Sequence, residues 1–108
     1  MARVPRPYEV VFDTAARQDL RDVFDYISTR ASADIAERFV NRLFEHCTSL
    51  GHTPERGTRR DELRPGLRTM GYRKRATVVF EVKRAERTVV ILGVYYGGRN
   101  YADDFSEE

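Results

Sequence analysis

The hydrophobic period of the chain changes near residue 54, and this change limits the folds that the sequence can adopt. In the first half, apolar side chains recur at the spacing of one helix face, first over residues 16–27 and again over residues 36–50. In the second half, residues 76–82 alternate between apolar and polar, and residues 88–96 are almost continuously apolar. The sequence therefore predicts two amphipathic helices followed by a strand-rich segment.

Capping residues set the expected boundaries in the first half. Aromatic and β-branched residues at 8–12 predict a short strand. Asp13 or Thr14 is expected to cap the first helix and Ser32 the second, and Gly51 predicts the end of the second helix. The link between the helices is short, so we expect an antiparallel helical hairpin.

Turn residues divide the second half into three strands. Pro65-Gly66 predicts a turn before an extended segment at residues 67–72, and the polar residues 83–87 predict a reversal between two longer strands. We therefore expect an α+β fold with an N-terminal strand, an antiparallel helical hairpin and a three-stranded antiparallel meander, arranged in two layers.

The size and composition of the chain favour one domain. Its 108 residues, 41% apolar and 33% charged, suit a single globular domain over residues 1–108, with a short extension at residues 1–7 and an acidic tail at residues 101–108. No apolar run approaches the roughly 18 residues of a membrane span, and the start lacks the apolar core of a secretory signal. We therefore expect a cytoplasmic protein that does not bind membranes.

Positive charge is concentrated where the hydrophobic period changes. Residues 56–75 hold eight basic residues against only Asp61 and Glu62, a local balance of +6, whereas the whole chain carries +2. Such a surplus predicts a surface that meets an anionic partner. Its arginines and nearby tyrosines suit a nucleic acid, an acidic protein segment or a solvated rim of internal ion pairs, and the residues alone leave all three open.

Residues suited to catalysis or to metal binding are sparse. His46 and His52 do not share a helix face and are expected to be solvated residues at the helix end. Cys47 falls on an apolar helix face and is expected to be a buried small hydrophobe. No serine elbow and no glycine-rich phosphate loop is present. We therefore predict no catalytic residue, no cofactor and no metal site.

Three stretches carry a resemblance to a known family. The most specific is Pro-Glu-Arg-Gly at residues 54–57 followed by Glu-Leu-Arg-Pro-Gly-Leu-Arg at residues 62–68; the others are residues 12–43 and the strand with a Gly-Gly-Arg ending at residues 91–99. Over residues 8–99 the chain resembles the ParE branch of the RelE/ParE toxin superfamily. This resemblance implies the toxin of a bacterial type II toxin–antitoxin pair, with a RelE/ParE-like fold.

The resemblance also implies partners. ParE-like toxins act on DNA gyrase and are held inactive, in a hetero-oligomeric complex, by the acidic and apolar C-terminal segment of a cognate antitoxin. Operator DNA is bound by another part of the antitoxin, so no sequence-specific DNA binding is expected of this chain. Eight residues are expected to contact the antitoxin or the target: Arg60, Arg64, Arg68, Tyr72, Arg73, Arg75, Tyr96 and Arg99.

The competing hypothesis is a RelE-like, ribosome-dependent mRNA endonuclease. RNA cleavage needs a base, an acid and cations for the phosphorane charge. The second half has arginines but no histidine, and its lysines are only Lys74 and Lys83. Tyr95, Tyr96 or Tyr101 could serve as acid or base. We therefore predict a protein-binding inhibitor rather than an enzyme, with the nuclease as the alternative.

Overall fold

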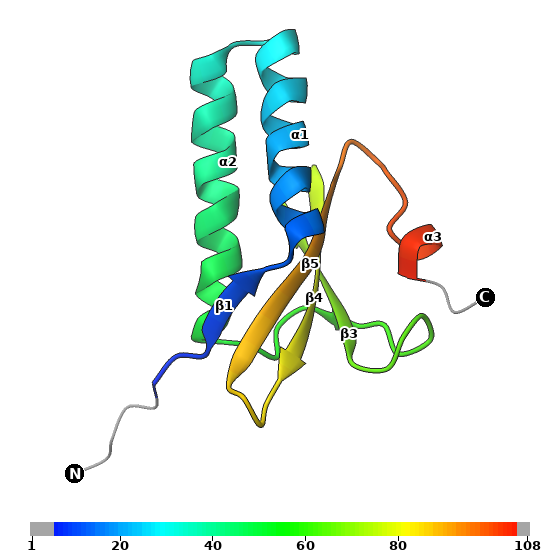
Figure 1. The fold of residues 1–108 in the computed structure, drawn as a ribbon. Coiled ribbons are helices and arrows are strands. Elements are labelled where there is room, and N and C mark those ends of the chain that lie inside the picture. Colours follow the sequence, from blue (N-terminus) through cyan, green and yellow to red (C-terminus); the bar gives the residue numbers. More distant parts are fainter. Residues whose placement is uncertain (1–5, 106–108) are drawn as a thin grey trace.

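A computed structural model describes residues 6–105 of the chain (Figure 1). Most of the expected N-terminal extension and the last three residues of the expected acidic tail lie outside the described residues. The elements are β1 (Glu9–Phe12), α1 (Thr14–Arg30), α2 (Ala33–Thr48), the 3₁₀ turn η1 (Ser49–Gly51), β2 (Thr58–Arg59), β3 (Leu67–Tyr72), β4 (Ala76–Lys83), β5 (Thr88–Tyr96) and α3 (Ala102–Phe105). The predicted strands and both long helices are confirmed.

Side-chain caps begin both long helices. The Asp13 carboxylate accepts a 2.7 Å hydrogen bond from the Thr14 N–H at the start of α1. The Ser32 hydroxyl accepts a 3.2 Å bond from the Ile35 N–H at the start of α2. Each cap satisfies a backbone donor that has no partner inside the helix. The helices lie side by side as the predicted hairpin (Figure 1).

The sheet is mixed rather than a simple meander. Its strand order is β1-β5-β4-β3-β2; β1 pairs in parallel with β5, and the other pairings are antiparallel. The meander of β3, β4 and β5 was predicted, whereas the parallel pairing of β1, the two-residue β2 and the short α3 were not. β5 contributes Val89, Ile91 and Val94 to the core under the helices and Leu92 and Tyr95 to a cluster on the other face, which explains its nearly continuous apolar sequence.

A β-bulge changes which residues of β5 face the main core. Val79 pairs with Gly93 and Phe80 with Ile91, so Leu92 is the extra residue on β5. Val89 and Ile91 before the bulge and Val94 after it all lie in the core under the helices, because the extra residue shifts the alternation by one, while Leu92 packs on the opposite face.

The main core lies between the helical hairpin and the sheet. Its fully buried side chains include Leu43 of α2, Phe80 of β4 and Ile91 of β5. The two-layer α+β design is therefore confirmed. A smaller cluster on the second face joins Leu67, Val79 and Tyr95 to side chains of the loop before β3 and of residues 101–105, so the second face is partly covered as well.

Within residues 6–105, no helix has the length and apolar character needed to cross a membrane.

Candidate functional site

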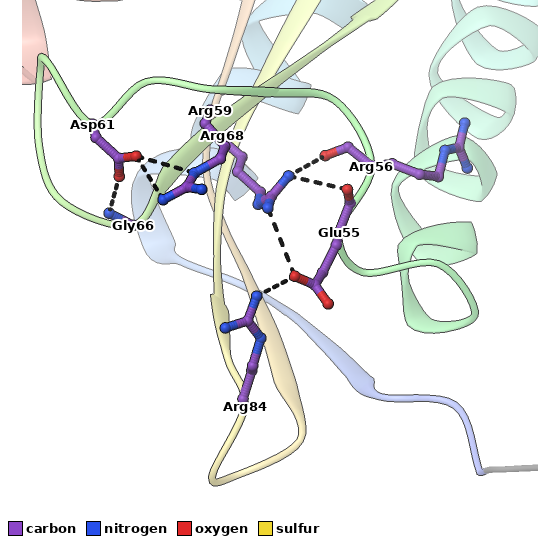
Figure 2. Close-up of polar contacts among 7 residues, drawn as sticks. All are labelled: Glu55, Arg56, Arg59, Asp61, Gly66, Arg68 and Arg84. Carbon is purple, nitrogen blue, oxygen red and sulfur yellow. Dashed lines mark hydrogen bonds and ion pairs between the residues drawn. The ribbon is translucent and has the colours of Figure 1, made fainter.

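Arg68 of β3 holds the loop that precedes β2. Its Nη1 donates to the carbonyl oxygens of Glu55 and Arg56 at 3.0 and 3.3 Å, and its Nη2 lies 3.8 Å from the Glu55 carboxylate (Figure 2). Arg84, in the turn after β4, pairs with the same carboxylate. The Arg68 side chain is only 14% exposed. Arg68 therefore ties the loop to the sheet instead of offering a free cation.

Asp61 stabilises the loop between β2 and β3. Its carboxylate accepts a 2.9 Å hydrogen bond from the Gly66 N–H and pairs at 3.0 Å with Arg59 (Figure 2). The hydrogen bond from the Gly66 N–H holds the pKa of the Asp61 carboxyl below its usual value, and the positive charge of Arg59 contributes to the same shift. Asp61 is therefore an ionised turn residue and not a general acid.

Two further arginines of the predicted site make contacts within the fold. Arg60 donates from Nε to the Thr69 hydroxyl at 3.1 Å and lies 4.0 Å from Glu62. Arg64 pairs at 3.5 Å with Glu81 of β4. Arg60, Arg64 and Arg68 thus each have partners within the fold, and the pairs with Glu55 and Glu81 offset part of the expected charge surplus.

The turn between β3 and β4 presents three consecutive cations. Arg73, Lys74 and Arg75 are exposed, and within residues 6–105 no carboxylate oxygen lies within 4.0 Å of their charged nitrogens. Arg56 is also exposed and has no carboxylate oxygen within 4.0 Å among residues 6–105; it donates to the hydroxyls of Ser49 and Thr53 instead. The unpaired positive charge therefore lies at the two ends of the basic segment.

The predicted tyrosines have different environments. Tyr72 is 8% exposed, with its ring centroid 5.6 Å from Phe39 and 5.0 Å from His46, so it belongs to the core. Tyr96 is partly buried and makes edge contacts with Tyr26 and Phe39. It also borders a mainly apolar hollow of about 230 Å³ that Arg99 helps to line.

Tyr95 is engaged by the C-terminal segment. Its hydroxyl donates a 2.6 Å hydrogen bond to Asp104, and its ring packs against Tyr101 and Phe105. Burial, with the Asp104 hydrogen bond second, raises the pKa of Tyr95 above its usual value. Tyr95 is therefore a neutral structural residue here.

Asp19 of α1 protects the part of β5 that lies beyond the end of β1. Its carboxylate accepts a 2.9 Å hydrogen bond from the Val94 N–H, a backbone donor with no neighbouring strand on that side. Burial is the main cause that raises the pKa of Asp19 above its usual value. Sequence reasoning missed this contact, because its two residues lie far apart in the chain.

The prediction of a solvated His46 was wrong, whereas His52 is exposed as expected. The His46 ring packs on Tyr72, and its Nε2 is buried with no hydrogen-bond partner within the part of the chain that the structure describes. Burial, then the charge of Arg56, lowers the pKa of His46. Cys47 is fully buried as predicted, and burial raises the pKa of its thiol to about 12.

Stability is expected to fall as the pH drops below about 6.5, the usual histidine pKa. The folded pKa of His46 is depressed, so the unfolded state takes up the proton first and gains stability relative to the fold. His46→Phe keeps a ring against Tyr72 and removes this titration. Urea unfolding at pH 8 and pH 5 measures the difference.

The His46→Phe variant should lose less stability than wild type between these two pH values, and His52→Gln should behave as wild type. Parallel pH profiles for wild type and His46→Phe would contradict the assignment.

Among residues 6–105, no three His, Cys, Asp or Glu side chains are grouped so that they could hold a metal ion.

A family model described as the ParE toxin of the type II toxin–antitoxin system parDE matches residues 10–101. This match covers most of the chain. The chain belongs to the ParE toxin family. It is thus a type II toxin of the RelE/ParE superfamily, and the resemblance to the ParE branch is confirmed. No curated protein matches the sequence.

Solved toxin structures share the fold of this ParE family member. The chromosomal ParDE system of P. aeruginosa matches with a TM-score of 0.71 at 21% identity, covering 82% of this chain and 95% of that one. The RelBE2 complex of Mycobacterium tuberculosis gives 0.63 at 24% identity, with 87% and 95% covered. A double mutant of E. coli RelE in the free state gives 0.64 at 14% identity, with 93% and 94% covered.

Proposed function

We propose that this ParE family toxin inhibits DNA gyrase by binding it as a protein, without catalytic residues of its own. The family match over residues 10–101 carries the proposal, together with the likeness to the ParDE system of P. aeruginosa. Gyrase works on chromosomal DNA, so the proposed site of action is the cytoplasm.

The exposed arginines of the β3–β4 turn and the mainly apolar hollow beside α1 are suited to binding another protein. Arg73 and Arg75 stand at the β3–β4 turn without carboxylate partners in residues 6–105, and Arg99 and Tyr96 border the mainly apolar hollow beside α1. Guanidinium groups next to apolar surface suit a protein partner. We assign these four residues to partner contact, while Arg60, Arg64 and Arg68 make contacts within the fold and Tyr72 packs in the core against Phe39 and His46.

A cognate antitoxin is the second proposed partner. The structural relatives include toxin–antitoxin complexes of the ParDE and RelBE types. We propose a hetero-oligomeric complex in which an acidic and apolar antitoxin segment covers the toxin, and in which operator binding is left to the antitoxin.

The RelE-like nuclease is the alternative, and it draws support from the shared fold of E. coli RelE. The side chains favour it less. The Tyr95 hydroxyl is hydrogen-bonded to Asp104, and the His46 ring packs on Tyr72 at the end of α2. Of the three tyrosines considered for a nuclease, this leaves Tyr96 and Tyr101 as candidates for its acid or base.

Purified toxin tests the two functions side by side. We expect it to block supercoiling of relaxed plasmid by gyrase, and to leave messenger RNA intact in a translating ribosome extract. The protein encoded beside the toxin gene, added first, should restore supercoiling. Codon-linked RNA cleavage with unimpaired supercoiling would overturn the gyrase proposal in favour of the nuclease.

A further inference from the structure

A polar hollow of about 240 Å³ lies between the loop before β2 and the strands β3 and β4. The charged side chains of its lining are two acids and three arginines: Glu55, Asp61, Arg59, Arg68 and Arg84 (Figure 2). The arginines belong to β2, to β3 and to the turn after β4, so segments that are far apart in the sequence bring guanidinium groups to one hollow. Convergent polar groups in a hollow are typical of a site for a small ligand.

The lining of this hollow has more hydrogen-bond donors than acceptors. A guanidinium group carries several N–H donors and no acceptor. Within residues 6–105, Arg84 donates from Nη2 to the Glu55 carboxylate, and Arg59 directs Nε and Nη2 at one oxygen of Asp61. The side chains of Arg59 and Arg84 are 72% and 65% exposed, so their other N–H groups are open to solvent. The hollow is therefore suited to a ligand that brings acceptor atoms.

The charges of the lining are unequal as well. Three guanidinium groups face two carboxylates, and the Glu55 carboxylate is shared, because it pairs with Arg84 and lies 3.8 Å from Arg68. Exposed ion pairs contribute little to stability, so folding alone does not account for three arginines at one hollow. The lining therefore favours an anion.

We infer that this hollow binds the phosphate group of a small anionic ligand. A phosphate group supplies the negative charge and the acceptor oxygens that the lining lacks, and planar guanidinium groups bind it through paired hydrogen bonds. A water molecule takes up about 30 Å³ in the liquid, so a hollow of about 240 Å³ has room for a phosphate group and several waters. The lining contains none of the four residues assigned to partner contact, so the inference goes beyond the proposed function and does not depend on gyrase.

A small ligand fits this hollow better than a nucleic acid does. The phosphates of a duplex follow one another along its length, and proteins bind them with cations that are spread over a face. Arg59, Arg68 and Arg84 instead border a single hollow. Because Arg68 is only 14% exposed, it is more accessible to a small anion than to the rigid outer surface of a duplex.

Glu55 competes with the ligand for the same arginines. Its carboxylate pairs with Arg84 and lies near Arg68. The loop itself is held through its main chain, since Nη1 of Arg68 donates to the carbonyl oxygens of Glu55 and Arg56 at 3.0 and 3.3 Å. Glu55→Gln therefore removes the competing charge while the loop stays attached, and it should tighten phosphate binding. A cluster of purely structural ion pairs predicts no such gain.

Isothermal titration calorimetry with pyrophosphate, at an ionic strength held constant with sodium chloride, tests the site. Wild type should bind saturably. Arg59→Gln and Arg84→Gln should each weaken binding about fivefold or more, and Glu55→Gln should tighten it about threefold or more. Thermal midpoints within about 4 °C of wild type confirm that these variants are folded. Arg17→Gln/Arg21→Gln removes two exposed charges from α1 and should bind pyrophosphate as wild type does.

The inference is overturned by absence of saturable wild-type binding, by equal binding in wild type and both arginine variants, or by a Glu55→Gln variant that does not bind more tightly. A labelled duplex of about twelve base pairs, read by fluorescence anisotropy, tests the other source of phosphate. Duplex binding that requires Arg59 and Arg84, in a protein that does not bind pyrophosphate, would assign these arginines to nucleic acid and reject the small ligand. Inhibition of gyrase without pyrophosphate binding would reject the phosphate site alone, whereas pyrophosphate binding without inhibition would reject the gyrase target alone.

Discussion

Gly57→Ala is expected to lower the free energy of unfolding by roughly 2–4 kcal/mol. Gly57 ends the Pro-Glu-Arg-Gly run and has a φ of +80°, a conformation that disfavours any side chain. A Cβ atom at this position would lie 2.3 Å from the carbonyl oxygen of Thr69 on β3. That oxygen belongs to a paired strand, so the loop itself must move. The movement would disturb the Arg68 hydrogen bonds to Glu55 and Arg56.

Gly66→Ala is the matched control, measured beside Gly57→Ala by urea unfolding. Gly66 has a similar φ of +84°, but no atom lies within 4 Å of the position that its Cβ would take. Its loss should therefore be only the backbone strain of about 1–2 kcal/mol. Equal losses in the two variants would show that the contact with Thr69 has no effect.

The elements were predictable because their signals are local. Asp13 and Ser32 cap the helices through residues one and three positions away, and the apolar periods identify the faces of the helices and strands. The parallel pairing of β1 with β5 joins Glu9 to Thr88, and no local signal identifies that partner. The same limit applies to α3, whose packing depends on Tyr95.

The free positive charge of residues 56–75 was overestimated for a related reason. A window over residues 56–75 counts Arg64 and Arg68 as free, because their partners Glu81 and Glu55 lie outside it. Whether an arginine is paired depends on strand register and loop path, which the count does not contain. The three consecutive cations of the β3–β4 turn are exposed and have no carboxylate partner within residues 6–105.

The positive φ angles of Arg73 and Lys74 in the β3–β4 turn were not predictable either. Arg73-Lys74 lacks the glycine or asparagine that usually indicates positive φ.

Phe80→Ala is expected to lower the free energy of unfolding by about 3–5 kcal/mol, a large part of the stability of a domain of this size. Phe80 is fully buried beside the β-bulge, and it packs in the core between the helices and the sheet, with Leu43 of α2 and Ile91 of β5. Truncation removes apolar contacts from both layers and leaves a cavity that the paired strands cannot close. Chemical unfolding in urea measures the loss.

Phe44→Ala tests whether burial, and not the loss of a phenyl ring as such, causes this effect. Phe44 is 45% exposed on α2 and stacks on Phe12 at a centroid distance of 5.0 Å. Its truncation should cost only about 1 kcal/mol, close to the value of an aromatic pair plus partial burial. A loss at Phe44 that equals the loss at Phe80 would mean that the edge of the hairpin, and not the bulged centre of the sheet, holds the two layers together.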